Sequence, residues 1–104
     1  MNENDYKRAK EYSELIKYDE SKANLSGADL FGANLSNVNL IRANLSNADL
    51  SKANLVRANL FNANLSGADL RKTDLSKANL VGANLRGATV TIGNVVRKIE
   101  FHED

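Results

Sequence analysis

Residues 23–32 read Ala-Asn-Leu-Ser-Gly-Ala-Asp-Leu-Phe-Gly, and they open a run in which one five-residue unit is repeated thirteen times, up to residue 87. Leu fills the third position of every unit, and Ala fills the first except at Val38 and Thr73. The second position holds nine Asn and four Asp, whereas the last two positions vary. Repetition this strict fixes an architecture but leaves little room for position-specific chemistry.

The unit suits an extended backbone with a corner. Alternate side chains of an extended chain point to opposite sides, so Ala and Leu share one face while the Asn or Asp between them faces out. The chain must then bend over the last two positions to bring the next Ala inward. A helix fails on period, because Leu residues five apart advance by about 140° beyond a full turn and form no stripe. The sequence therefore predicts a solenoid in which each unit forms one side and one corner.

A weaker period of twenty residues is superimposed on the period of five. Two sets of similar residues recur at this spacing: the carboxylates Asp29, Asp49 and Asp69, and the apolar fourth-position residues Ile41, Phe61 and Val81. Stacking of every fourth unit would select such a period, because side chains one coil apart are then neighbours at about 4.8 Å. We therefore expect four sides per coil.

The units at residues 23–27 and 28–32 and their successors resemble the pentapeptide-repeat family, whose members form right-handed, four-sided parallel β-helices. The resemblance covers residues 23–87 and extends to residues 88–92 as a degenerate fourteenth unit. It implies an all-β solenoid of about 3.5 coils filled by Leu and Ala. It is specific for the fold and says little about activity, since the family is functionally diverse.

The two ends of the chain differ from the repeat in residues 21–92. Residues 1–20 are charged, with apolar residues at helical spacing that include Tyr6, Tyr12, Leu15 and Ile16. We expect an N-terminal α-helical cap over the first coil, because the end of a solenoid needs cover. A membrane-surface helix fits less well, because six acidic residues in this segment outnumber four basic ones.

Residues 93–104 form a C-terminal tail that begins with the turn signal Gly-Asn. Its β-rich part contains Val95, Val96, Ile99 and Phe101. Two interpretations stay open: the tail folds back as a strand over the last coil, or it pairs with its copy in a homodimer.

An outward apolar stripe is the most informative surface feature. Ile41, Phe61 and Val81 occupy the fourth position on one expected side, so they should stack one above another. Such a stripe either binds a partner or is covered by a terminal segment of the same chain. We expect a non-enzymatic scaffold or protein-interaction module whose partner is a protein.

The sequence offers no catalytic, cofactor or metal site. Cys is absent and His102 is the only His, so a zinc site is excluded. Asp29, Asp49 and Asp69 suggest a cation or acid/base ladder, but Asn replaces Asp in most units, which favours a structural role. No apolar run has the length of a signal peptide, and we expect a cytoplasmic protein without membrane contact.

Two nucleic-acid functions are alternatives. Some family members mimic duplex DNA and bind type II topoisomerases, and the resemblance carries that activity as a hypothesis. Residues 21–92 hold eight Lys or Arg against four Asp, which disfavours an imitation of a polyanion. Direct but weak nucleic-acid binding would use basic residues on two adjacent sides; no row of aromatic residues for base stacking accompanies them. These residues are Lys52, Arg57, Arg71, Lys72 and Lys77.

Overall fold

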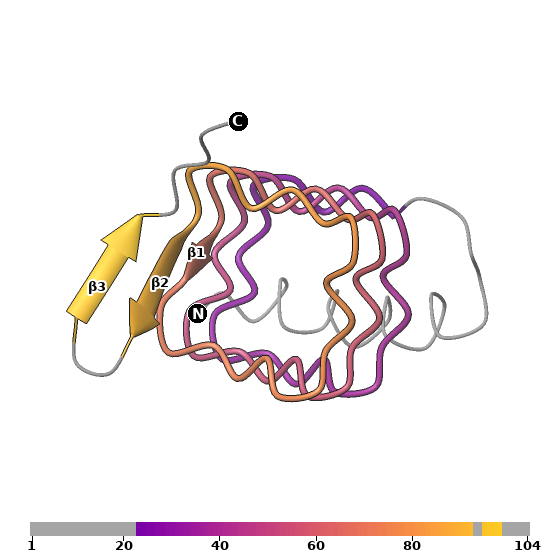
Figure 1. Ribbon diagram of the computed structural model, residues 1–104, viewed down its shortest axis with the longest axis horizontal. Coiled ribbons are helices and arrows are strands. Elements are labelled where there is room, and N and C mark those ends of the chain that lie inside the picture. Colours follow the sequence, from indigo (N-terminus) through magenta and orange to yellow (C-terminus); the bar gives the residue numbers. More distant parts are fainter. Residues whose placement is uncertain (1–22, 93–94, 99–104) are drawn as a thin grey trace.

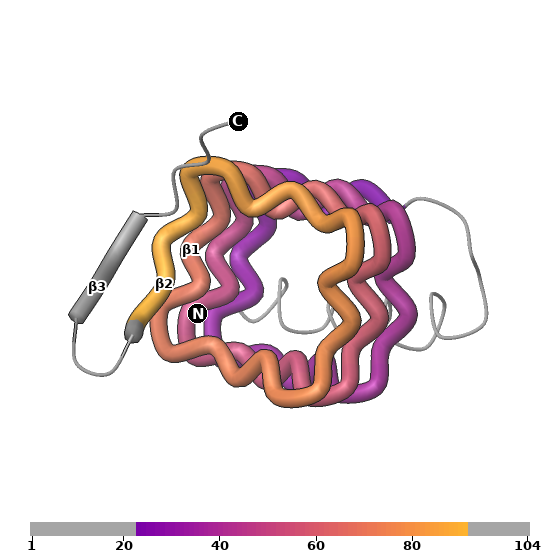
Figure 2. The backbone as a smooth tube through the Cα atoms, in the orientation of Figure 1, coloured from indigo at the N-terminus to yellow at the C-terminus, as the bar shows by residue number. Residues whose placement is uncertain are grey.

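The computed structural model describes residues 23–92 and 95–98, in which residues 23–92 wind into a four-sided column of stacked coils (Figures 1 and 2). Parallel β-bridges join the second-position residue of one unit to the residue twenty positions later. One such column of bridges runs Asn24, Asn44, Asn64 and Asn84. The spacing confirms that every fourth unit stacks, as the twenty-residue period predicts.

Backbone hydrogen bonds between coils hold the column together. Within each side, the amide of the Leu donates to the next coil, as Leu45 N does to Asn64 O at 2.7 Å, and Asn64 N donates back to Ala43 O at 2.9 Å. A third bond joins the corners, as in Asn47 N to Ser66 O at 2.9 Å. Most sides are tied by a single bridged residue, so they are shorter than the three-residue strand expected from the unit.

Each corner is a tight turn with a left-handed residue in the fifth position. The amide of the next Ala donates to the Leu carbonyl across the turn, as Ala48 N does to Leu45 O at 3.1 Å. From residue 27 to residue 87 the fifth position has φ between 56° and 76°. One residue with positive φ at the third place of a four-residue turn is the pattern of a type II turn. Five corners use Gly, and the other eight are Asn37, Arg42, Asn47, Lys52, Arg57, Asn62, Lys72 and Lys77.

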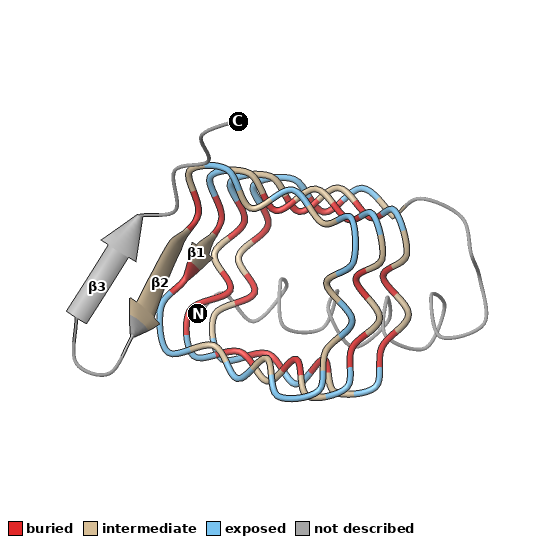
Figure 3. Cartoon of the chain, viewed as in Figure 1, coloured by how far each residue is buried: buried red, intermediate tan, exposed pale blue. Residues whose placement is uncertain are grey.

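The core is a stack of Leu and Ala side chains inside the column, and the buried residues recur along the sides of the column in Figure 3. The leucines from Leu25 to Leu70 are 3% exposed or less. Leu75, Leu80 and Leu85, in the last coil, are only partly buried. The end of the column that follows residue 72 is therefore the more open part of the described core.

Three short strands form one sheet at this open end. β1 (Asp69–Leu70) pairs in parallel with β2 (Thr89–Ile92), and β2 pairs in antiparallel fashion with β3 (Val95–Lys98). β3 places the start of the C-terminal tail as a strand on the edge of β2, with Lys98 opposite Thr89 (Figure 1). The outer edge of β3 ends the sheet within the described residues, and the two interpretations of the tail, a cover over the last coil or a dimer contact, stay predictions.

Several predicted residues lie outside the described part of the chain. The N-terminal cap of residues 1–20, with Tyr6, Tyr12, Leu15 and Ile16, is among them, so the cap stays a prediction. Residues 99–104, which contain Ile99, Phe101 and His102, are also outside it.

Candidate interaction surface

The second-position side chain of every unit is fixed by a hydrogen bond to its own backbone. Its Oδ1 accepts from the amide two residues further on, at 2.9–3.2 Å, in all thirteen units. This is an Asx turn, which Asn and Asp make equally well because both carry an Oδ1. The prediction that the second-position side chains face outward did not include this hydrogen bond to the backbone. The restriction of the second position to Asn and Asp is the feature of the sequence that indicates it.

The Asx turns determine what each side offers to solvent. Because Oδ1 accepts from the backbone, the Nδ2 group is the donor that each Asn side chain has left for other contacts. Asn79 Nδ2, for example, donates to Asn59 Oδ1 on the coil before it at 3.3 Å. Only the side that carries Asp29, Asp49 and Asp69 replaces these amides with carboxylates over three successive coils.

The predicted apolar stripe is present as a stack. Arg42 N donates to Phe61 O at 2.8 Å, and Asn62 N donates to Val81 O at 2.9 Å, which places the fourth-position residues of this side on successive coils. Ile41 and Phe61 are half-buried, and Val81 is 66% exposed. Among residues 23–91, Val81 is the large hydrophobic residue whose side chain is exposed.

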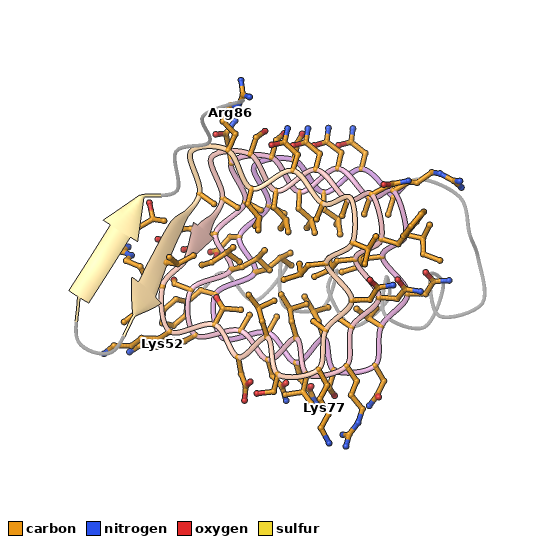
Figure 4. All side chains as sticks on the ribbon, viewed as in Figure 1. Lys52, Lys77 and Arg86 are labelled. Carbon is orange, nitrogen blue, oxygen red and sulfur yellow. The ribbon has the colours of Figure 1, made fainter. Side chains whose placement is uncertain are left out.

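Cationic corners border the stripe. Arg57 and Lys77 form the corner before this side, and Arg42 lies in the corner after it; all three are exposed. Lys77 extends outward from the lower part of the column in Figure 4, whereas Arg86 extends from the upper part. The three units of the stripe side, residues 38–42, 58–62 and 78–82, contain no carboxylate. The stripe therefore lies at the second corner of this side, beside Arg42, and the row of Asn39, Asn59 and Asn79 separates it from the cations of the first corner.

The carboxylate ladder is engaged in structural contacts. Arg71 Nη2 lies 2.6 Å from Asp69 Oδ2, and this charge-assisted hydrogen bond holds the pKa of Asp69 below its ordinary value. Asp49 Oδ1 accepts from both the amide and the hydroxyl of Ser51, at 3.0 and 2.5 Å. Within the described ranges no group of three or more potential ligands could hold a metal ion. The ladder therefore behaves as a set of turn-forming residues.

Four of the basic residues of the column stack in pairs at two neighbouring corners. Lys52 and Lys72 stack at one corner and Arg57 and Lys77 at the next, because their units lie twenty residues apart. Lys52 Nζ lies 5.6 Å from the centre of the Phe31 ring, which is within the range of a cation–π contact. Residues 23–92 carry seven Lys or Arg against four Asp.

No helix that could cross a membrane is found in the described part of the chain. The C-terminal candidates Val95 and Val96 lie in β3, which pairs with β2 on the side that carries Asp69. The stripe is the predicted feature whose side chains the structure brings together.

Comparison with known proteins identifies the repeat. The family described as Pentapeptide repeats matches residues 23–60 and 53–91, with eight copies. A pentapeptide repeat protein of the cyanobacterium Nostoc PCC 7120, solved by crystallography, is 37% identical, with a TM-score of 0.51. The match covers 78% of this chain and 74% of that protein.

Two further crystal structures are similar to the chain in part. HetL of Nostoc sp. strain PCC 7120, a pentapeptide repeat protein involved in heterocyst differentiation regulation, is 29% identical with a TM-score of 0.38; the match covers 70% of this chain and 43% of HetL. A pentapeptide repeat protein of Cyanothece 51142 is 33% identical with a TM-score of 0.33, over 70% of this chain and 59% of that protein. No curated protein matches the chain. The chain belongs to the pentapeptide repeat family, and its column is the right-handed β-helix solenoid of that family.

Proposed function

We propose that the protein is a non-enzymatic scaffold that binds a protein partner through the stripe of Ile41, Phe61 and Val81. The observation that carries this proposal is the exposure of Val81, 66%, at the end of a stack of apolar side chains on a column whose core is already filled by Leu and Ala. The core leucines need no further cover along the sides of the column. The apolar stripe on the outside is therefore not needed to fill the core, and exposed apolar surfaces of this kind mark contact sites.

The charge of the column supports a protein partner over the nucleic-acid alternatives. Seven basic residues against four Asp in residues 23–92 make the column a poor imitation of duplex DNA. Direct binding of a single strand needs aromatic platforms beside the cations. Residues 23–92 contain two aromatic residues, Phe31 and Phe61, which lie on different sides; Lys52 already lies over Phe31, and Phe61 is half-buried.

For the whole chain we propose a column of about 3.5 coils, capped by a helix within residues 1–20. We also propose that the outer edge of β3 pairs with the same edge of a second copy. β3 is the last strand of its sheet among the described residues, and an edge strand offers unpaired amides and carbonyls to another chain. Pairing of this kind would form a homodimer through the C-terminal tail.

Site-specific photo-crosslinking in cells tests the stripe as a contact surface. A photoreactive residue is placed at Val81, and in a matched protein at Ser76, which is exposed at the same position of the preceding unit. We expect protein adducts from position 81 that are missing from position 76. They should be lost when Ile41→Ser and Phe61→Ser are introduced together, and kept in the control Val56→Ser, a half-buried apolar residue on the neighbouring side. Equal adducts from both positions would refute the proposal.

A further inference from the structure

We propose that the occupant of the stripe is an amphipathic α-helix whose apolar face is bordered by Asp and Glu. This inference rests on the proposed function and adds the chemical class of the partner. It is carried by three properties of the stripe side: the spacing of its apolar residues, the sign of the charges at its borders, and the orientation of its Asn side chains.

The spacing of the stripe matches a helix that lies along the column. Successive coils are about 4.8 Å apart, so Ile41 and Val81 are separated by roughly 9.6 Å along the column axis. Residues i and i+7 of an α-helix, which lie on one face, are about 10.5 Å apart, and the residue between them is one turn from each. Same-face residues i and i+4 of an extended strand are about 13 Å apart. A helix therefore keeps register with the three stacked side chains, and a strand does not.

The borders of the stripe attract negative charge. Arg57 and Lys77 stack at the corner before this side, across its row of Asn side chains from the stripe, and Arg42 lies next to Ile41 in the corner of the stripe itself. The three units of this side have no carboxylate, and neither do the units of the side that follows it, residues 43–47, 63–67 and 83–87. The nearest carboxylate across the other corner, Asp74, accepts from the amide and hydroxyl of Ser76 at 3.0 and 2.5 Å. Acidic residues that flank the apolar face of a helix would meet the cations of both corners, and they would meet no carboxylate on the stripe side itself.

The Asn side chains add donors to the same border. Asn39, Asn59 and Asn79 use Oδ1 to accept from the amides of Ile41, Phe61 and Val81, at 3.1, 3.2 and 3.0 Å. Their Nδ2 groups are the donors left on these side chains, and Asn79 Nδ2 already donates to Asn59 Oδ1 at 3.3 Å. This side therefore presents a row of amide groups between the cations of its first corner and the apolar stripe at its second corner. Carboxylates of a partner can accept from the amide hydrogens that are not already bonded, and the cations of a basic helix cannot.

The test uses the full chain and three synthetic peptides of 18 residues, with affinity measured by fluorescence anisotropy at about 0.15 M salt. The first peptide is a helix former with Leu at i, i+4, i+7 and i+11 and Glu on both flanks. In the second every Glu is Lys. The third has the composition of the first, rearranged so that no helical face is apolar. We expect the first peptide to bind at least tenfold more tightly than either of the others.

Two variants link binding to the borders of the stripe. Lys77→Glu should lower the affinity for the Glu peptide at least threefold and raise the affinity for the Lys peptide. Lys72→Glu is the matched control, because it occupies the same turn position, with φ of 59° against 60° for Lys77, one side away from the stripe. It should leave both affinities within about twofold. Ile41→Ser with Phe61→Ser should remove binding of the Glu peptide.

The results separate the two proposals. No peptide binding, equal affinity for the Glu and Lys peptides, or binding to anionic lipid vesicles in place of the Glu peptide would overturn the helix assignment. Occupation of the stripe by residues 1–20 of the chain itself would also appear as no peptide binding and would overturn it. If stripe-dependent adducts from position 81 persist in any of these cases, the interaction surface stands and only the class of partner is wrong. Loss of both signals would remove both proposals.

Discussion

Replacement of a core leucine tests whether the column is closed along its length and open at the end after residue 72. Leu60 and Leu80 occupy the same position of the same side, one coil apart. Leu60 is 0% exposed, whereas Leu80 is only partly buried. Leu→Ala removes three carbons, which at about 0.8 kcal/mol each is a transfer loss of roughly 2.4 kcal/mol for a fully buried side chain. The closed cavity left at Leu60 raises the expected loss to about 3 kcal/mol.

The same change at Leu80 should cost much less. A half-buried side chain loses about half of the transfer free energy, and a gap that opens to solvent adds little, so we expect about 1 kcal/mol. Urea unfolding of the two variants and the wild-type protein, followed by far-ultraviolet circular dichroism, gives both losses directly. The slope of the free energy of unfolding against urea should stay unchanged. Equal losses for Leu60→Ala and Leu80→Ala would refute the reasoning, because they would mean that the last coil is covered as well as the middle one.

Three further predictions concern the corners, the carboxylates and the tail. Gly67→Ala and Gly27→Ala share the strain of a left-handed backbone, with φ of 69° and 68°, but only at Gly67 would the added Cβ collide with the side chain of the coil before it. Gly67→Ala should therefore lower the urea midpoint more than Gly27→Ala does, and an equal effect would contradict the stacking. The Arg71 contact lowers the pKa of Asp69, so this carboxylate stabilises the fold above its ordinary pKa of about 3.9 and less as the pH falls through that value and below it. Asp69→Asn keeps the turn and should reduce the loss of stability between neutral pH and pH 3; an unchanged loss would show that the ion pair contributes nothing. Light scattering should give twice 11.4 kDa for the full chain and a monomer when residues 93–104 are removed, and two monomers would rule out pairing through β3.

The side of the column could be predicted because its determinants are periodic. The five-residue unit placed Ala and Leu inside, and the recurrence of Asp29, Asp49 and Asp69 every twenty residues predicted the bridges that the structure contains. Both inferences depend on patterns that many units repeat. An error at one unit would not have changed them.

The corners were harder to predict because intrinsic preference contradicts them. The left-handed conformation favours Gly, and Asn tolerates it. Lys52, Arg57 and Lys77 nevertheless adopt it, with φ of 59–61°. The closure of each coil imposes this conformation, at roughly 1 kcal/mol for each such residue. The Asx turns were missed for a related reason. An outward polar residue looks like a solvated surface until its hydrogen-bond partner is known.

The stripe and the tail show two properties that the sequence alone could not predict. The stacking of Ile41, Phe61 and Val81 followed from the period, but their unequal exposure did not, because it depends on where the column ends. Whether the tail pairs within its own chain or with a second copy depends on which strand edge it contacts. The antiparallel pairing of β3 with β2 is a contact that the same residues could equally make with another chain.

The direction of the hydrogen bonds between coils also determines how the molecule resists force. Because these bonds run along the column, tension between its two ends pulls directly on the bonds of the outermost coil, which then detaches before the next coil is loaded. Each detached coil releases twenty residues, or about 65 Å of extended chain. Tension across the column loads many coils together in shear. A single molecule pulled end to end should therefore lengthen in even steps that begin at the half-open last coil, and the same molecule pulled from side to side should hold to a higher force and then yield at once.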